Sequence, residues 1–221
     1  QTAKAHDALR VAYRDTVTAW GRVEFLRFGP LSAKGRRERF AFWPDPRGVV
    51  ARQLRQVLAA KNPDLLVPGA LAKQSAALQG LPALALLIAP AEKKAKSAKV
   101  ADDDRGAYSC QFAGAVADNL AVLAREIREG WTGDNSYRAV MLGPGPDNKI
   151  YKSNAESAAD LVRALLTGLQ VVSETQVRPR PAVAAGETAP KTTKQRKPIR
   201  PFEPMNGYSA YYVGSLEGLK A

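Results

Sequence analysis

Histidine and cysteine are almost absent from this chain of 221 residues, which contains one of each, His6 and Cys110. Because a zinc site usually needs three or four nitrogen or sulfur ligands at close spacing, histidine and cysteine cannot build one here. A disulfide within the chain is excluded as well. We interpret Cys110 as a small buried apolar side chain in a helix, and His6 as a surface residue near a helix end.

Long apolar runs are also missing, since no stretch reaches the roughly 18 residues that suggest a membrane-spanning helix. The sequence has no P-loop, dinucleotide fingerprint or nucleophile elbow. We interpret the glycine–proline run 143–146 as a turn, because its prolines lack the amides that a phosphate cradle needs. The acidic run 102–104 is more typical of a solvated segment than of a cation site.

What the chain has in quantity is alanine, leucine and positive charge. Its hydrophobic fraction is 45%, with few aromatic residues, and this composition favours helix over sheet. We therefore predict an all-α fold. The net charge is +12 with a pI of about 10.0, but no nucleic-acid motif accompanies it, so a nucleic-acid partner is not favoured. Association with a membrane surface stays open.

Apolar spacing predicts the order of the helices. We expect helices over residues 4–27, 47–61, 68–88, 104–130 and 154–177, and a last one starting near Asn206. The third is interrupted at Pro82, and residues 31–47 form a long aromatic-rich connection. These elements predict a first helical bundle over 1–177, a basic proline-rich linker or loop over 178–204, and the start of a second helical half over 205–221.

Several motifs together resemble the imelysin-like family of bacterial proteins. The most specific pair is an Arg-Phe-Gly-Pro turn at 27–30 followed by an aromatic-Trp-Pro-Asp segment at 42–45. Residues 79–84 fit the helix that carries the family's Gly-x-His-x-x-Glu motif. Residues 108–131 and 200–219 resemble later helices, so the likeness covers nearly the whole chain.

The resemblance implies an up-down α-helical bundle with two related halves, of which this chain only begins the second. It also implies export to the periplasm or outer cell envelope with the signal peptide removed, a link to iron uptake, and in some members metallopeptidase activity with iron or zinc. Aligning Gly80 with the motif glycine places Pro82 at the histidine and Ala85 at the glutamate. Proline and alanine neither ligate a metal nor transfer a proton, so we lean against an enzyme.

The remaining candidates for ligand binding are Arg27, Asp45, Glu24 and Trp43. We expect Arg27 and Asp45 to form a charge-assisted pair that ties the turn to the aromatic segment, with Glu24 orienting Arg27. The alternative is that Arg27 holds an anionic ligand. Our first hypothesis is a non-catalytic envelope protein that binds a ligand or partner in iron uptake. A metal-dependent peptidase with an atypical site, or a scaffold that uses the basic segment 178–200, are the alternatives.

Overall fold

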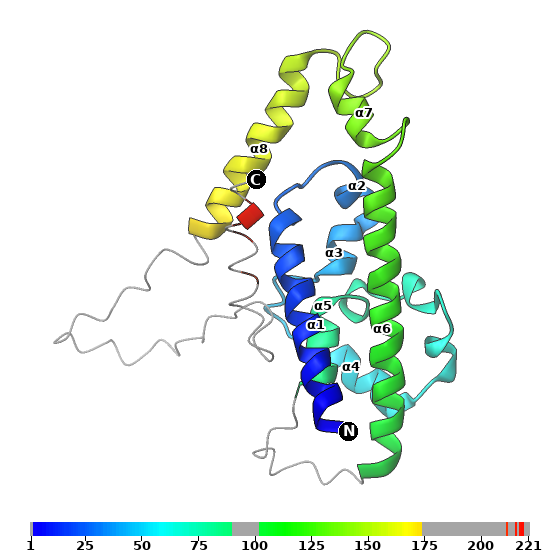
Figure 1. Ribbon diagram of the computed structural model, residues 1–221. Helices are drawn as coiled ribbons and strands as arrows, with labels where there is room; N and C mark the ends of the chain where they lie inside the picture. The colour runs from blue at the N-terminus through cyan, green and yellow to red at the C-terminus, as the bar shows by residue number, and fades with distance from the viewer. Residues whose placement is uncertain (1, 90–101, 174–210, 212–214, 216, 219–221) are drawn as a thin grey trace, which may run out of the picture.

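The structure, a computed structural model, describes residues 2–89, 102–173, 211, 215, 217 and 218. Across these residues every regular element is helical, so the predicted all-α bundle is confirmed. Helices α1 (Thr2–Val23) and α6 (Asp102–Trp131) are roughly parallel in Figure 1, and α5 contacts both of them among the shorter helices. The shorter helices are α2 (Gly29–Ser32), η1 (Ala33–Gly35), α3 (Arg36–Phe40), α4 (Val49–Ala60), η2 (Pro63–Leu66), η3 (Ala70–Lys73), η4 (Ala76–Leu78) and α5 (Leu81–Ile88). Two further helices, α7 (Tyr137–Leu142) and α8 (Asn154–Val172), follow α6.

The core lies between α1, α5 and α6. On α6, a stripe at helical spacing is fully or almost fully buried, as the sequence pattern predicts. The same core buries three side chains of α1, Tyr13, Val17 and Trp20. The Trp20 ring stacks on Phe40 of α3, with the ring centroids 4.7 Å apart. Burial of these apolar side chains is the main stabilising contribution to the bundle. The α6 stripe consists of Phe112, Val116, Leu120 and Leu123.

The region after α1 differs from the prediction. Helix α1 ends at Val23 rather than near residue 27, and Gly29 and Pro30 open α2 instead of only ending a helix. Proline fits there because the first turn of a helix has no partner for its missing amide. The predicted connection 31–47 also contains η1 and α3. For residues 68–88 the sequence left open two short helices or one bent helix. The segment consists of η3, η4 and α5, with Pro82 in the first turn of α5, so it is broken and not bent.

Helix α8 begins as predicted, with the Ser153 hydroxyl accepting a hydrogen bond from the Glu156 amide. Most of the large apolar side chains of α8 are exposed to solvent, whereas an ordinary bundle helix buries its apolar face. Of the leucines and valine that the sequence pattern placed on one face, Val172 is buried, whereas Leu161, Leu165 and Leu169 are exposed.

Other sequence predictions have mixed outcomes. Cys110 is exposed and not buried, because position 110 of α6 lies away from the stripe that packs in the core. In the part of the chain that the structure describes, no helix is long and apolar enough to cross a membrane. The predicted linker 178–204 and the His6 side chain lie outside the described residues. Within 205–221 the four described residues, which include Tyr211 and Ser215, are helical.

Candidate functional site

The glycine of the family-like motif lies where two backbones touch. A Cβ at Gly80 would be 2.3 Å from the carbonyl oxygen of Phe40 and 2.6 Å from that of Arg39. The preceding residue, Gln79, is 1% exposed and accepts a hydrogen bond from Arg39 Nε at 2.8 Å. Asn119 of α6 donates to the Gln79 carbonyl oxygen at 3.0 Å. Gly80 therefore has a packing role, which joins the start of α5 to α3 and α6.

The two positions that follow the motif glycine have no chemistry of the metallopeptidase type. Pro82 is half-buried in the first turn of α5, and Ala85 is 1% exposed within the hydrophobic core. Their neighbours on α5, Leu81, Ala83 and Leu84, belong to the same core. Among the described residues, no group of three or more histidine, cysteine, aspartate or glutamate side chains is placed to hold a metal ion.

The aromatic-Trp-Pro-Asp segment ends in a helix cap. The Asp45 carboxylate accepts hydrogen bonds from the amides of Val49 at 2.8 Å and Val50 at 2.9 Å, which are the first residues of α4. A carboxylate at a helix N-terminus satisfies free amides and interacts favourably with the helix dipole. The Trp43–Pro44 peptide bond just before it is cis, and the Trp43 side chain is half-buried.

The ion pair expected between Arg27 and Asp45 does not form, because the Asp45 carboxylate is engaged by the α4 amides. Arg27 is exposed, and among the described residues its side chain has neither a hydrogen bond nor an ion pair, with Glu24 or with any other group. The Arg27–Asp45 pair was inferred from opposite charge, and the Glu24–Arg27 pair from opposite charge and i,i+3 spacing. Neither feature specifies side-chain direction.

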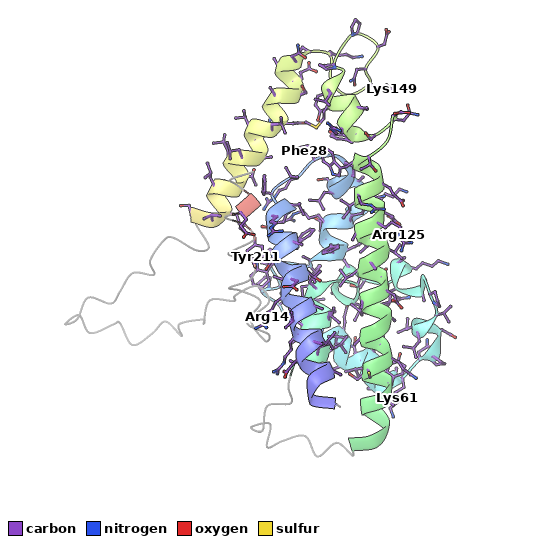
Figure 2. The ribbon with its side chains drawn as sticks, in the orientation of Figure 1. Arg14, Phe28, Lys61, Arg125, Lys149 and Tyr211 are labelled. Atoms are coloured by element: carbon purple, nitrogen blue, oxygen red, sulfur yellow. The ribbon has the colours of Figure 1, made fainter. Side chains whose placement is uncertain are left out.

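The turn after Arg27 instead packs on the end of α6, where Phe28 lies close to the upper end of that helix (Figure 2). The Phe28 ring meets Trp131 edge to face, with centroids 5.8 Å apart. Gly29 (φ +59°) lies under the ring of Tyr137, at a distance that leaves no room for a Cβ. Aromatic packing on the end of α6 thus explains the structural role of Phe28 and Gly29 in this turn.

Glu24 has a different partner from the one that the sequence predicted. It is 7% exposed at the end of α1, and its carboxylate accepts a hydrogen bond from the Tyr211 hydroxyl. Burial and the Glu24 charge raise the pKa of Tyr211, while Arg37 lies near enough to oppose that rise. We call Glu24, Arg37, Tyr211 and Ser215 the Glu24 centre.

Two buried donors, one on Arg37 of the Glu24 centre and one on Trp20, lack hydrogen-bond acceptors among the described residues. Trp20 Nε1 and Arg37 Nε are buried and have no partner among the described residues. Buried polar atoms are satisfied in most proteins, so unsatisfied ones often mark a site for water or a ligand. Tyr211 was missed as part of the site because 187 residues separate it from Glu24.

The cavities of the described residues differ in size and position. A cavity of about 10 Å³ adjoins Glu24, Gly21, Gly168 and Ser215, which is space for one water at most. An open hollow of about 490 Å³ lies beside α7, where Asp134, Asp147 and Lys149 contribute charges of both signs. None of the residues predicted from sequence lines this hollow.

These features define an all-α bundle in which Gly80 has a packing role, and in which Pro82 and Ala85 belong to the first turn and the buried face of α5. The sequence profile of the imelysin peptidase family matches residues 1–197, and the chain belongs to that family. No curated protein and no solved structure matches the chain.

Proposed function

We propose that this chain is a non-catalytic member of the imelysin family that binds a ligand or partner in the bacterial envelope, in the context of iron uptake. The observation that carries the proposal is the pair Pro82 and Ala85. A metallopeptidase needs a metal that activates water and a group that takes its proton. The side chains at these two positions supply neither function.

The core packing at Ala85 supports this proposal further. A glutamate in place of a side chain that is 1% exposed would bring an unpaired carboxylate into an apolar environment. The surroundings of this position are therefore adapted to alanine. We infer that the family motif has become part of the hydrophobic core in this chain, with Gly80 kept for its close backbone contact.

We further propose that the ligand acts at the Glu24 centre. The buried Glu24 carboxylate and the Tyr211 hydroxyl supply oxygen atoms, which hard cations prefer as ligands. The small cavity there has no room for an organic ligand, so the proposal favours an ion or a bound water. Among the ligand-binding candidates predicted from the sequence, Glu24 is the one that lies at this proposed site.

Thermal melting of the full chain with ferric citrate or zinc chloride tests this function. An ion that binds only the folded protein raises the melting temperature in proportion to the logarithm of its concentration. We expect such a rise with ferric ion for the wild type and a smaller one for Glu24→Gln, with Glu129→Gln as a control on an exposed carboxylate of α6. An equal rise in all three proteins would place the ion elsewhere. No rise with either ion would remove metal binding from the proposed function.

A further inference from the structure

The open hollow beside α7 shares no lining residue with the cavity at the Glu24 centre, and the function proposed above does not use it. Its volume of about 490 Å³ is within the range of roughly 300–1,000 Å³ that small-molecule sites have. Helix α7 and the segments on either side of it form the walls. We call this cavity the α7 hollow, and its charged and large apolar lining residues are Asp134, Val140, Asp147, Lys149 and Ile150.

The loop after α7 is held in place by the side chain of Asn148. Its amide nitrogen donates hydrogen bonds to the carbonyl oxygens of Val140 at 2.7 Å and Gly143 at 2.9 Å. Its amide oxygen accepts hydrogen bonds from the backbone amides of Ile150 and Tyr151, both at 2.9 Å. One side chain therefore ties the end of α7 to the far side of the loop, and this wall of the hollow has its shape before any ligand binds.

Tyr151 anchors the end of this loop in the protein. Its side chain is 3% exposed, and its hydroxyl donates a hydrogen bond to Asp160 of α8 at 2.6 Å. Because that bond uses the single hydroxyl proton of Tyr151, its other hydrogen bond, at 2.6 Å, is donated by the Tyr137 hydroxyl of α7. On the opposite wall, the buried Ser136 hydroxyl accepts a hydrogen bond from the Ala139 amide and caps α7. A ligand of the α7 hollow thus loses little free energy to ordering of the walls.

Three charged side chains line the hollow, with Asp134 on the wall before α7, and Asp147 and Lys149 on the wall after it. All three are exposed, and none of them forms an ion pair with another described residue. Charge-assisted hydrogen bonds are stronger than neutral ones, so these groups are the strongest attachment points in the hollow. Two carboxylates and one ammonium group fit a ligand that carries charges of both signs.

Ligands with a single charge fit the hollow less well. A simple anion would be repelled by both carboxylates, and a simple cation would leave Lys149 without a partner and close to a like charge. The net charge of +12 also repels a small cation at long range, whereas a zwitterion has no net charge. For a metal ion, no group of three or more histidine, cysteine, aspartate or glutamate side chains is suitably placed in the described part of the chain.

The apolar lining indicates the body of the ligand. Val140 lies on α7, and Ile150, on the facing loop, is 50% exposed. Both offer aliphatic surface that a ligand can remove from water. We propose that the α7 hollow binds a small zwitterion with an aliphatic body, of the class of the aliphatic amino acids, with its ammonium group paired to Asp134 and Asp147 and its carboxylate paired to Lys149. This inference does not depend on the ion proposed at the Glu24 centre.

Amide chemical-shift changes in two-dimensional NMR spectra of the full chain, titrated with L-leucine, test the proposal. Because all three charged groups are exposed, each pair contributes little, and we expect a Kd on the order of 1 mM. The amides that shift should be those of the hollow, at Asp134 and at residues 147–150. Glu24→Gln should bind leucine like the wild type, which separates this site from the ion at the Glu24 centre.

Variants and analogues assign the two charges. The double variant Asp134→Asn with Asp147→Asn, and separately Lys149→Met, should each raise the Kd for leucine by about threefold or more. Asp118→Asn is the matched control, because Asp118 is an exposed carboxylate of α6 outside the hollow, and it should bind like the wild type. Isoamylamine lacks the carboxylate of leucine and isocaproate lacks its ammonium group, so each should bind about threefold more weakly or worse. Circular dichroism confirms that each variant is folded.

Three results would overturn the inference. One is the absence of shifts at the hollow with leucine up to about 20 mM. Another is leucine binding that the aspartate and lysine variants leave unchanged, which would locate the amino acid elsewhere on the surface. The third is isoamylamine or isocaproate that binds as tightly as leucine, because the hollow would then recognise one charge and not two.

Discussion

Replacing Gly80 with alanine is the most informative single substitution in this protein. The new Cβ would lie 2.3 Å and 2.6 Å from two backbone carbonyl oxygens, well inside the usual 3.5 Å or more between nonbonded atoms. Backbone atoms cannot rotate away, so the start of α5 must move away from α3. The φ angle of Gly80 is −121°, a value that alanine adopts freely, so the cost comes from the close contact and not from backbone strain.

The magnitude follows from the contacts that this movement disturbs. Forcing an extra methyl group into a packed site costs about 1–3 kcal/mol. Moving α5 also lengthens the hydrogen bonds that Gln79 makes with Arg39 and Asn119, each worth about 1 kcal/mol. We expect Gly80→Ala to lower the free energy of unfolding by about 3–4 kcal/mol, a large part of the stability of a typical domain.

Urea unfolding followed by circular dichroism measures this change, with the slope m checked for constancy. Gly114→Ala is the matched control, because a Cβ at Gly114 has no heavy atom within 4 Å and the residue lies inside α6. It should raise the free energy of unfolding by about 0.5–1 kcal/mol, since alanine favours a helix interior. A Gly80→Ala protein within about 0.5 kcal/mol of the wild type would refute the packing role of the motif glycine.

Three further predictions concern the cap, an ion pair and the buried tyrosines. Asp45→Ala removes the cap of α4 and should lower the free energy of unfolding by about 1 kcal/mol, measured by urea unfolding. Glu126→Gln should cost about 1 kcal/mol at neutral pH, because buried Arg36 loses its charged partner at 2.8 Å. The hydrogen bond from Arg36 lowers the pKa of Glu126, so this stability is present above the usual carboxyl range, and the difference between wild type and variant should vanish in acid titrations of stability. Burial raises the pKa of Tyr13 and Tyr211, so the folded protein keeps protons that the unfolded chain releases above about pH 10, and stability should fall there by about 1.4 kcal/mol per pH unit for each tyrosine. Tyr13→Phe should reduce that slope, and an unchanged slope would show that Tyr13 ionises freely in the folded state.

Periodic apolar spacing predicted the long elements of this fold. The stripe from Phe112 to Leu123 on α6 is buried as expected, because a helix of 30 residues repeats the pattern several times. The short helices α2, α3 and α7 were missed, since four to six residues are too few to show periodicity. Their stability comes from tertiary contacts such as the stacking of Trp20 on Phe40.

The candidate site was harder to predict than the fold. The loss of the motif side chains at Pro82 and Ala85 stays a prediction from the resemblance, which needs residue type alone, because residue type decides whether a side chain can ligate a metal. The partners of Glu24 and Asp45 depend on three-dimensional arrangement. Asp45 binds backbone amides that any sequence would supply, and Glu24 meets a tyrosine far along the chain. Neither contact leaves a signal in local spacing. The direction of the leucines on α8 had the same difficulty, since periodicity identifies a face but not what covers it.

The central proposal is that this imelysin-family chain does not hydrolyse peptides, because the resemblance aligns Pro82 and Ala85 with the motif histidine and glutamate. The most direct test is hydrolysis of fluorescently labelled casein by the purified full chain loaded with zinc or ferrous ion, with and without a chelator. We predict the same background rate in all samples. Chelator-sensitive hydrolysis that persists through purification to homogeneity would contradict the claim, and would require a catalytic metal site built from other residues.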